Sequence, residues 1–135
     1  MASIVVGVDG SDEARRALDW AVAEARLRGA ALRVVHAYQS QPDAAGTERL
    51  RREADLIVQA AVTACETDGL DVDARAVSGS APSALLEASR GADLLVVGSR
   101  GRHGFPGLLL GSVSQQLAHH ARCPVVIVPP ERPAQ

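Results

Sequence analysis

The residues best suited to chemistry lie between Gly98 and Ser112, in a segment rich in glycine that also carries arginine and histidine. It follows a short apolar run, 94–97, and precedes an amphipathic stretch, 112–121, whose periodicity predicts a helix. A backbone needs glycine where it adopts a positive φ or comes close to a ligand. A helix that begins directly after such a loop offers N–H groups and the positive end of its dipole to an anion. The segment therefore predicts a phosphate site, with a flexible surface turn as the alternative.

The chain contains no lysine, and its 14 basic residues are all arginines. A Walker-type phosphate loop requires the sequence Gly-Lys-Ser/Thr, so this class of site is excluded. Phosphate would have to be bound by backbone amides, hydroxyl groups and arginine.

Apolar or β-branched runs alternate with segments of helical periodicity along the chain. The expected strands are 3–8, 31–37, 72–77, 93–97 and 124–128. The expected helices begin after Ser11, at Thr47, after Ser80 and at Ser112, and they end near Gly29, Gly69, Gly91 and Ala121. No hairpin signal joins two runs, so the pattern predicts an α/β fold of Rossmann-like type. We expect a five-stranded parallel doubly wound open sheet with helices on both faces, and an edge position with one wet face for 72–77.

The strand order 3-2-1-4-5 would place two polar features on opposite sides of one crevice. An open sheet of this kind binds its ligand at the carboxyl ends of the strands, where the winding direction reverses. With this order, that point lies between the first and fourth strands. Asp9 ends the first and Gly98 ends the fourth, so the two should face each other. This convergence favours a binding site over a plain turn.

Length and charge restrict the classes of function. A chain of 135 residues predicts one domain over 1–135. The net charge of -2 gives no electrostatic reason to expect nucleic acid or an anionic membrane as partner. The sequence has no apolar run of about 18 residues and no signal-peptide pattern, so a cytoplasmic protein is expected.

Cysteine and histidine give no metal or disulfide pattern. Cys65 and Cys123 are isolated from each other and are interpreted as buried small apolar residues. His36 lies in an apolar run and is expected to be packed and hydrogen-bonded. His119 and His120 are neighbours on a helix and point about 100° apart, which argues against a shared metal ion.

The chain resembles the universal stress protein family, of the ATP-binding type, over its whole length. The resemblance is carried by Val-Val-Gly-Val-Asp-Gly-Ser at 5–11 and Cys-Pro-Val-Val-Ile-Val-Pro at 123–129. The ATP-binding members carry a Gly, two residues, Gly, nine residues, Gly, then Ser or Thr. Gly98, Gly101, Gly111 and Ser112 match this spacing in full.

The resemblance implies a role for each matching residue. Asp9 would accept hydrogen bonds from the ribose hydroxyls, although it could instead only cap the first helix together with Ser11. Val35 and Ala37, at the end of the second strand, would line the adenine. The residues implied around the phosphates are Gly98, Gly101, Gly111, Ser112 and, in the first helical turn, Val113 and Ser114, of which Ser114 could instead cap the helix.

Two further arginines and a histidine leave alternatives open. Arg100 and Arg102 could pair with phosphate or remain solvated. His103 stands where many relatives have glycine, and it could stiffen the loop or add a phosphate contact.

The sequence predicts a binding module rather than an efficient enzyme. It has no Ser-His-Asp ordering, no paired carboxylates, no zinc ligand set and no lysine for a transferring phosphoryl group. The expected function is that of an ATP-binding stress-response or signalling protein. We expect slow or negligible ATP hydrolysis, and Mg²⁺ or Mn²⁺ could accompany the phosphates. The alternatives are cyclic AMP binding, a slow ATPase or autophosphorylation at Ser112 or Ser114, and a nucleotide-free dimer. A flavin protein is a distant alternative, because aromatic residues are few.

The last strand predicts self-association. Val125–Val128 is apolar at every position, yet the expected order places it at a sheet edge, which invites pairing with another chain. Members of the family that it resembles commonly dimerise through this strand, so an isologous homodimer is expected.

Overall fold

Strands and helices alternate from one end of the chain to the other in the computed structural model, which describes residues 2–101 and 110–131. The elements are β1 (Ser3–Gly7), α1 (Asp12–Arg28), β2 (Ala31–Tyr38), α2 (Ala44–Thr63), β3 (Val72–Ser78), α3 (Ala81–Ala88), β4 (Leu94–Gly98), α4 (Ser112–His120) and β5 (Val125–Val128).

All the strand pairs in the described residues are parallel, in the order β3-β2-β1-β4-β5. The central strand β1 pairs on both sides, so Val6 lies opposite Val34 of β2 and Val96 of β4. The predicted strand order and the α/β class are therefore confirmed. The winding direction reverses between β1 and β4, as the sequence indicated.

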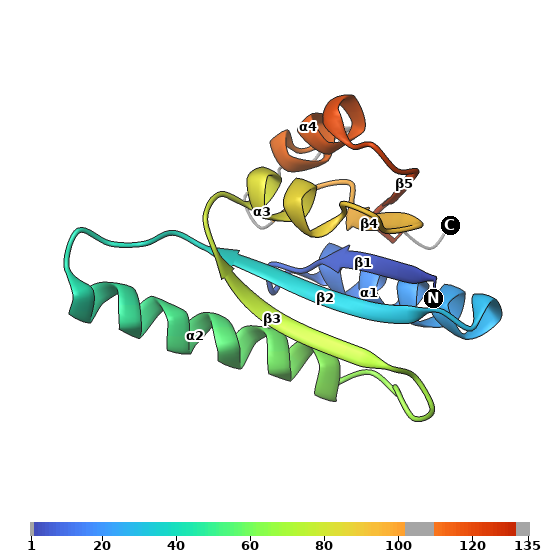
Figure 1. Cartoon of the computed structure of the whole chain (residues 1–135), viewed down its shortest axis with the longest axis horizontal. Helices are drawn as coiled ribbons and strands as arrows, with labels where there is room; N and C mark the ends of the chain where they lie inside the picture. Colours follow the sequence, from blue (N-terminus) through green and yellow to red (C-terminus); the bar gives the residue numbers. More distant parts are fainter. Residues whose placement is uncertain (1, 102–109, 132–135) are drawn as a thin grey trace.

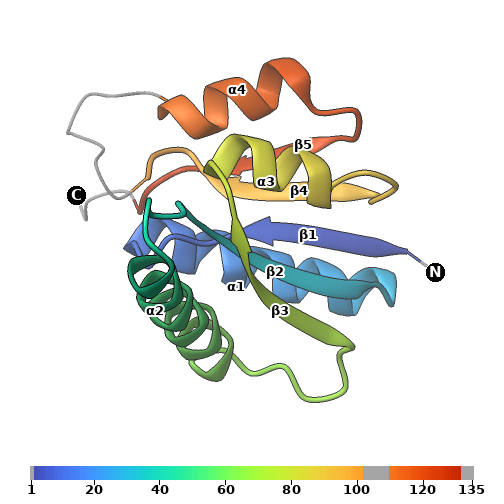
Figure 2. The same ribbon diagram turned by 60° about the vertical axis from the view of Figure 1, so that its left-hand side comes forward.

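Helices cover both faces of the sheet (Figure 1). Figures 1 and 2 show α1 and α2 on one side and α3 and α4 on the other. Successive residues of a strand point to opposite faces, so Val6 packs in the cluster beneath α1 and α2 while Val5 packs in the cluster beneath α3 and α4. Both valines are completely buried, as is typical of a parallel sheet covered twice.

The edge strand β3 carries charge on its open side. Asp73 and Arg75 are neighbours on one face of β3 and form an ion pair of 2.8 Å between Oδ2 and Nε. The Arg75 side chain is largely exposed and that of Asp73 about half exposed, which agrees with the predicted edge strand with one wet face.

Side-chain caps set the starts of α1, α2 and α3, and both ends of α2 differ from the prediction. Ser11 and Ser80 are the N-caps of α1 and α3, and Gly29 ends α1 in the left-handed region, all as predicted. The prediction that α2 begins at Thr47 was wrong. Asp43 caps this helix by accepting a hydrogen bond from the N–H of Gly46 at 2.9 Å, so the first turn begins at Ala44.

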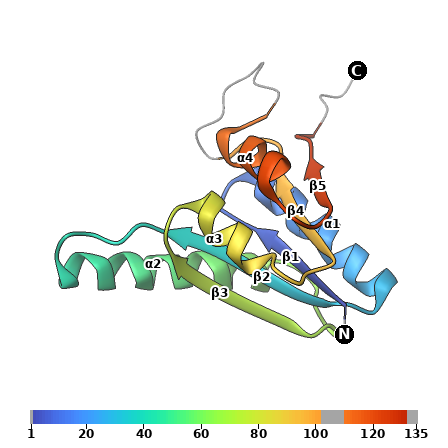
Figure 3. The same cartoon turned by 45° about the horizontal axis from the view of Figure 1, so that its top comes forward.

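The second helix also ends earlier than expected, at Thr63 rather than near Gly69. Figures 1 and 3 show its amino end extending past the neighbouring strands β2 and β3. Within the described residues, no helix combines the length and the apolar character needed to cross a membrane.

The two cysteines are free and only half-buried, so the prediction that they are buried was wrong. The Cys65 Sγ donates a hydrogen bond to Oδ1 of Asp19 at 3.3 Å. Desolvation by partial burial raises the pKa of both thiols, and at Cys65 the neighbouring Asp19 raises it further.

Candidate functional site

A cavity of about 630 Å³ opens where β1, β2 and β4 end and α4 begins. Within the described residues, those that the sequence analysis assigned to nucleotide binding all line this cavity: Asp9, Val35, Ala37, Gly98, Arg100, Gly101, Gly111, Ser112, Val113 and Ser114. The parallel sheet explains the convergence, because the carboxyl ends of its strands share one edge.

Asp9 and the loop after β4 meet across the crevice, as their positions in the sequence predicted. A Cβ atom added to Gly101 would lie 3.1 Å from Oδ2 of Asp9. The other oxygen, Oδ1, accepts a hydrogen bond from the N–H of Ser11 at 2.9 Å. Asp9 therefore supports the entry to α1 and at the same time presents its carboxylate to the cavity wall.

The glycines of the motif serve close approach within the chain. Gly98, Gly101 and Gly111 do not adopt positive φ, in contrast to Gly10, Gly29, Gly69, Gly79 and Gly91. A Cβ on Gly98 would lie 3.1 Å from Cβ and 3.2 Å from the carbonyl oxygen of Glu13 in α1. The absence of a side chain at residue 98 therefore lets the first turn of α1 lie directly against the end of β4.

Gly111 packs against the backbone of the same loop. Its N–H donates to the carbonyl of Ser99 at 2.6 Å. A Cβ on Gly111 would lie 3.3 Å from Cα of Arg100 and 3.4 Å from the nitrogen of Gly101. The loop after β4 and the start of α4 are thus held together without intervening side chains, and a wall made of backbone results.

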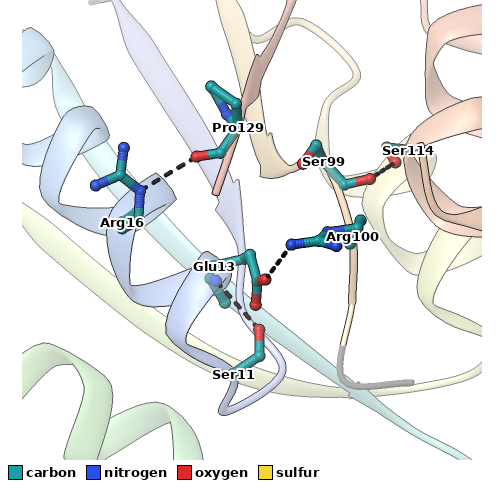
Figure 4. A network of polar contacts seen from close by, with 8 residues as sticks. Ser11, Glu13, Arg16, Ser99, Arg100, Ser114 and Pro129 are labelled. Atoms are coloured by element: carbon teal, nitrogen blue, oxygen red, sulfur yellow. Dashed lines mark hydrogen bonds and ion pairs between the residues drawn. The ribbon is translucent and has the colours of Figure 1, made fainter. Parts of the chain in front are cut away.

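The first turn of α4 contributes its N–H groups and two different serines. Gly111 is the N-cap, and it has no side chain to occupy the helix terminus. Ser112 is exposed, while Ser114 is buried and donates its hydroxyl to the carbonyl of Ser99 at 2.7 Å (Figure 4). Ser114 therefore acts as a tether for the loop, and the Ser112 hydroxyl is the one exposed at the cavity.

Arg100 lies in the cavity wall as part of an ion pair. Its Nη2 is 3.2 Å from Oε1 of Glu13, and the two side chains are 18% and 23% exposed. Arg100 is thus mostly buried rather than solvated. Arg102 and His103, the other loop residues considered in the sequence analysis, lie outside the described residues.

His36 is hydrogen-bonded, as predicted, and it also lines the cavity, which was not predicted. Its Nδ1 is 2.7 Å from the carbonyl oxygen of Val8. Because a carbonyl only accepts, Nδ1 is the donor of this hydrogen bond.

The sequence analysis missed several other lining residues, namely Gly7, Val8, Ala14, Ala81, Leu85, Val97, Leu110 and Gln115. Leu85 and Val97 also belong to the core beneath α3 and α4, so their apolar pattern gave no separate signal. Gly7 did give a sequence signal, as a glycine at the end of an apolar run. A Cβ there would lie 2.7 Å from Cδ1 of Leu85, so the glycine at the end of β1 makes room for this leucine.

Comparison with known proteins gives a consistent result. The sequence profile of the universal stress protein family matches residues 1–129. The chain belongs to the universal stress protein family. A universal stress protein of Thermus aquaticus is 40% identical over 133 residues, which cover 93% of this chain and 97% of that protein. A relative from Mycobacterium tuberculosis is 38% identical over 95% of this chain, which spans about half of its length, 48%.

Solved structures of universal stress proteins share the fold. One, described as a complex with cAMP, is 32% identical, with a TM-score of 0.79 and coverage of 94% of this chain and 96% of that one. Another, from Archaeoglobus fulgidus in complex with dAMP, is 24% identical, with a TM-score of 0.68 and coverage of 95% and 98%. At this lower identity the likeness concerns the fold alone.

Proposed function

We propose that this universal stress protein binds an adenine nucleotide, foremost ATP, in the cavity at the carboxyl ends of β1 and β4. It would act as a single-domain, nucleotide-dependent stress-response module in the cytoplasm. The observation that carries the proposal is the backbone wall formed by Gly98, Gly101 and Gly111, which lies at the amino terminus of α4 and opposite Asp9. Helix N-termini framed by close-packed glycines favour phosphate.

Each part of a nucleotide finds suitable chemistry in the cavity. Val35 and Ala37, together with Leu85, offer apolar surface for adenine. The Asp9 carboxylate can accept hydrogen bonds from ribose hydroxyls. The N–H groups of the first turn of α4 and the Ser112 hydroxyl can donate to phosphate oxygens.

A magnesium or manganese ion fits this arrangement only as a companion of the phosphates. The described residues hold no group of three or more His, Cys, Asp or Glu side chains that could bind a metal by themselves. Mg²⁺ is commonly held by one or two carboxylates together with substrate phosphates and water. Asp9 is the carboxylate that lines the cavity, and it would be the protein ligand. The ion would neutralise charge on the phosphates.

Cyclic AMP is the second candidate ligand. The solved structure that is 32% identical to this chain was determined as a complex with cAMP. Both ligands carry adenine and phosphate, and they differ in the free 3′-hydroxyl and in the number of phosphates. Asp9 would favour ATP if it accepts from both ribose hydroxyls, because cAMP retains one.

The site is proposed to hold its nucleotide rather than turn it over rapidly. The chain has no lysine to stabilise a transferring phosphoryl group, and Asp9 is already engaged by the N–H of Ser11. If slow autophosphorylation occurs, Ser112 is the better acceptor, because the Ser114 hydroxyl is buried and bonded to Ser99.

A homodimer through β5 is proposed on the basis of its outer edge. The carbonyls of Pro124 and Val128 accept hydrogen bonds from Leu95 and Ser99 on the inner side. Because backbone groups alternate along a strand, the N–H and C=O groups of Val125 and Ile127 point away from β4. They offer a ladder to a second copy of the chain.

Titration calorimetry of the purified protein with ATP, cAMP and GTP tests the proposal. We expect saturable binding of ATP in the micromolar range or tighter, weaker binding of cAMP, and little response to GTP. Equal affinity for GTP and ATP would contradict adenine recognition. Tighter binding of cAMP than ATP would reassign the ligand. Sustained phosphate release at about one per second or faster would show an enzyme instead.

A further inference from the structure

We propose that Glu13 is a positioning residue for nucleotide binding, because it holds the Arg100 guanidinium in the cavity wall where a phosphate would be bound. The proposal rests on the proposed nucleotide function and adds a residue that lies outside the glycine motif. Glu13 is not among the residues that line the cavity, whereas Arg100 is. Glu13 would therefore act through Arg100 and not by touching the ligand.

The backbone from which Arg100 projects is fixed by its neighbour Ser99. The N–H of Ser99 donates to the carbonyl of Val128 at 2.9 Å. Its own carbonyl accepts from the N–H of Gly111 at 2.6 Å and from the Ser114 hydroxyl at 2.7 Å. Three hydrogen bonds to Val128, Gly111 and Ser114 thus anchor Ser99, the residue that precedes Arg100.

Glu13 supplies that orientation from the opposite side of the crevice (Figure 4). It lies in the first turn of α1, which Ser11 caps by accepting from the N–H of Ala14 at 3.1 Å. Its backbone packs on Gly98, where a Cβ would approach within 3.2 Å. The Glu13 carboxylate therefore occupies a defined place, 3.2 Å from Nη2 of Arg100.

Two opposing effects follow from this ion pair. An arginine held in place loses less rotamer freedom when it binds phosphate, so preorganisation by Glu13 raises affinity. The negative charge of Glu13 repels phosphate and lowers affinity. Because both side chains are mostly buried and Arg100 lines the cavity whereas Glu13 does not, we infer that preorganisation is the larger effect.

Titration calorimetry of the full chain and its Glu13 variants with ATP and with adenosine measures the net effect of Glu13 on phosphate binding. Glu13→Ala should weaken ATP binding about tenfold, the effect expected from losing one hydrogen bond to a charged group. Adenosine, which lacks phosphate, should bind as in the unchanged protein. Glu13→Gln keeps an acceptor oxygen at the same length, so its ATP affinity should stay within about threefold. Glu13→Asp keeps the charge but withdraws it from Arg100, so it should lose affinity as Ala does.

A double-mutant cycle with Arg100→Ala provides the control. In that background Glu13→Ala should change ATP affinity by less than about twofold, because no guanidinium remains to be positioned. Circular dichroism and thermal melting of each variant verify the fold. If Glu13→Ala does not fold, the comparison of Glu13→Asp with Glu13→Gln decides the question.

Several results would overturn the inference. These are ATP binding by Glu13→Ala or Glu13→Asp at least as tight as before, an equal loss for adenosine, or an undiminished loss in the Arg100→Ala background. If ATP binds to the Glu13 variants as tightly as to the unchanged protein, the positioning role is refuted and the nucleotide function stands. Failure of the unchanged protein to bind any adenine nucleotide would overturn both.

Discussion

Replacement of Gly111 by valine tests the backbone wall most sharply. The Cβ would lie 3.3 Å from Cα of Arg100, 3.4 Å from the nitrogen of Gly101 and 3.5 Å from the carbonyl oxygen of Ser99. These neighbours are backbone atoms, which cannot rotate away as a flexible side chain can. The new side chain would therefore push the 99–101 backbone away from α4.

The size of the effect of Gly111→Val follows from the backbone contacts that the valine side chain would displace. Overpacking by extra methyl groups costs about 1–3 kcal/mol in a well-packed region. The hydrogen bond of 2.6 Å between Gly111 and Ser99 would lengthen or break, which adds about 1 kcal/mol. If the displaced loop loses its phosphate contacts, ATP affinity should fall at least tenfold, since each 1.4 kcal/mol corresponds to a factor of ten.

The assay is calorimetry with ATP and adenosine, accompanied by thermal melting. Gly111→Ala is the matched control, because it adds only the Cβ and should give a smaller loss of ATP affinity than valine does. Adenosine binding should change little in both variants. A folded Gly111→Val protein with unchanged ATP affinity would refute the argument that this glycine shapes the phosphate site.

Other predictions concern Asp9, the β5 edge and the thiols. Asp9→Asn keeps an acceptor for the N–H of Ser11 but removes the charge, so ATP affinity should fall about tenfold. With divalent metal ions removed, binding of 2′,3′-dideoxy-ATP should be unaffected by this change, and an equal loss for both ligands would contradict a ribose contact. Ile127→Pro removes an outward N–H and should give monomers in analytical sedimentation, whereas Ile127→Ala, which keeps the N–H, should remain dimeric; a dimeric proline variant would refute pairing at this edge. The raised pKa of Cys65 and Cys123 predicts that alkylation at pH 8 is slower in the folded protein than in urea, and that it accelerates as pH rises above the ordinary thiol pKa. Because the fold favours the protonated thiols, their contribution to the free energy of unfolding is present below the thiol pKa of the unfolded chain and is lost as pH rises through the pKa of the folded protein. Alkylation that is as fast in the folded protein as in urea would show that the pKa is not raised.

The fold could be predicted from the sequence because its signals are local and agree with one another. Val5 and Val6 belong to a short run that is apolar at successive positions, which is typical of a strand buried on both faces. Ser11 and Gly29 mark the two ends of α1 by capping chemistry. The predicted start of α2 was wrong because Asp43 and Thr47 are both good N-caps. In the structure Asp43 accepts from the N–H of Gly46, whereas the Thr47 hydroxyl is hydrogen-bonded to the backbone of Gln41.

The site could be predicted in its residues but not in its internal contacts. The spacing of Gly98, Gly101 and Gly111 singled out the loop, and the strand order brought Asp9 to it. The contact between Arg100 and Glu13 joins residues 87 positions apart, and no local pattern in the sequence relates them. For the same reason the partner of Gly98 was not predictable, since it is the backbone of another element.

Amide NMR of the protein during titration with ATP tests the central claim most directly, namely that main-chain N–H groups of the glycine wall bind the phosphates. The account predicts that the amide resonances of Gly101, Ser112 and Val113 shift strongly with ATP and much less with adenosine, while those of β3 stay in place. Binding of ATP that leaves these three amides unchanged, or shifts them equally with adenosine, would contradict it.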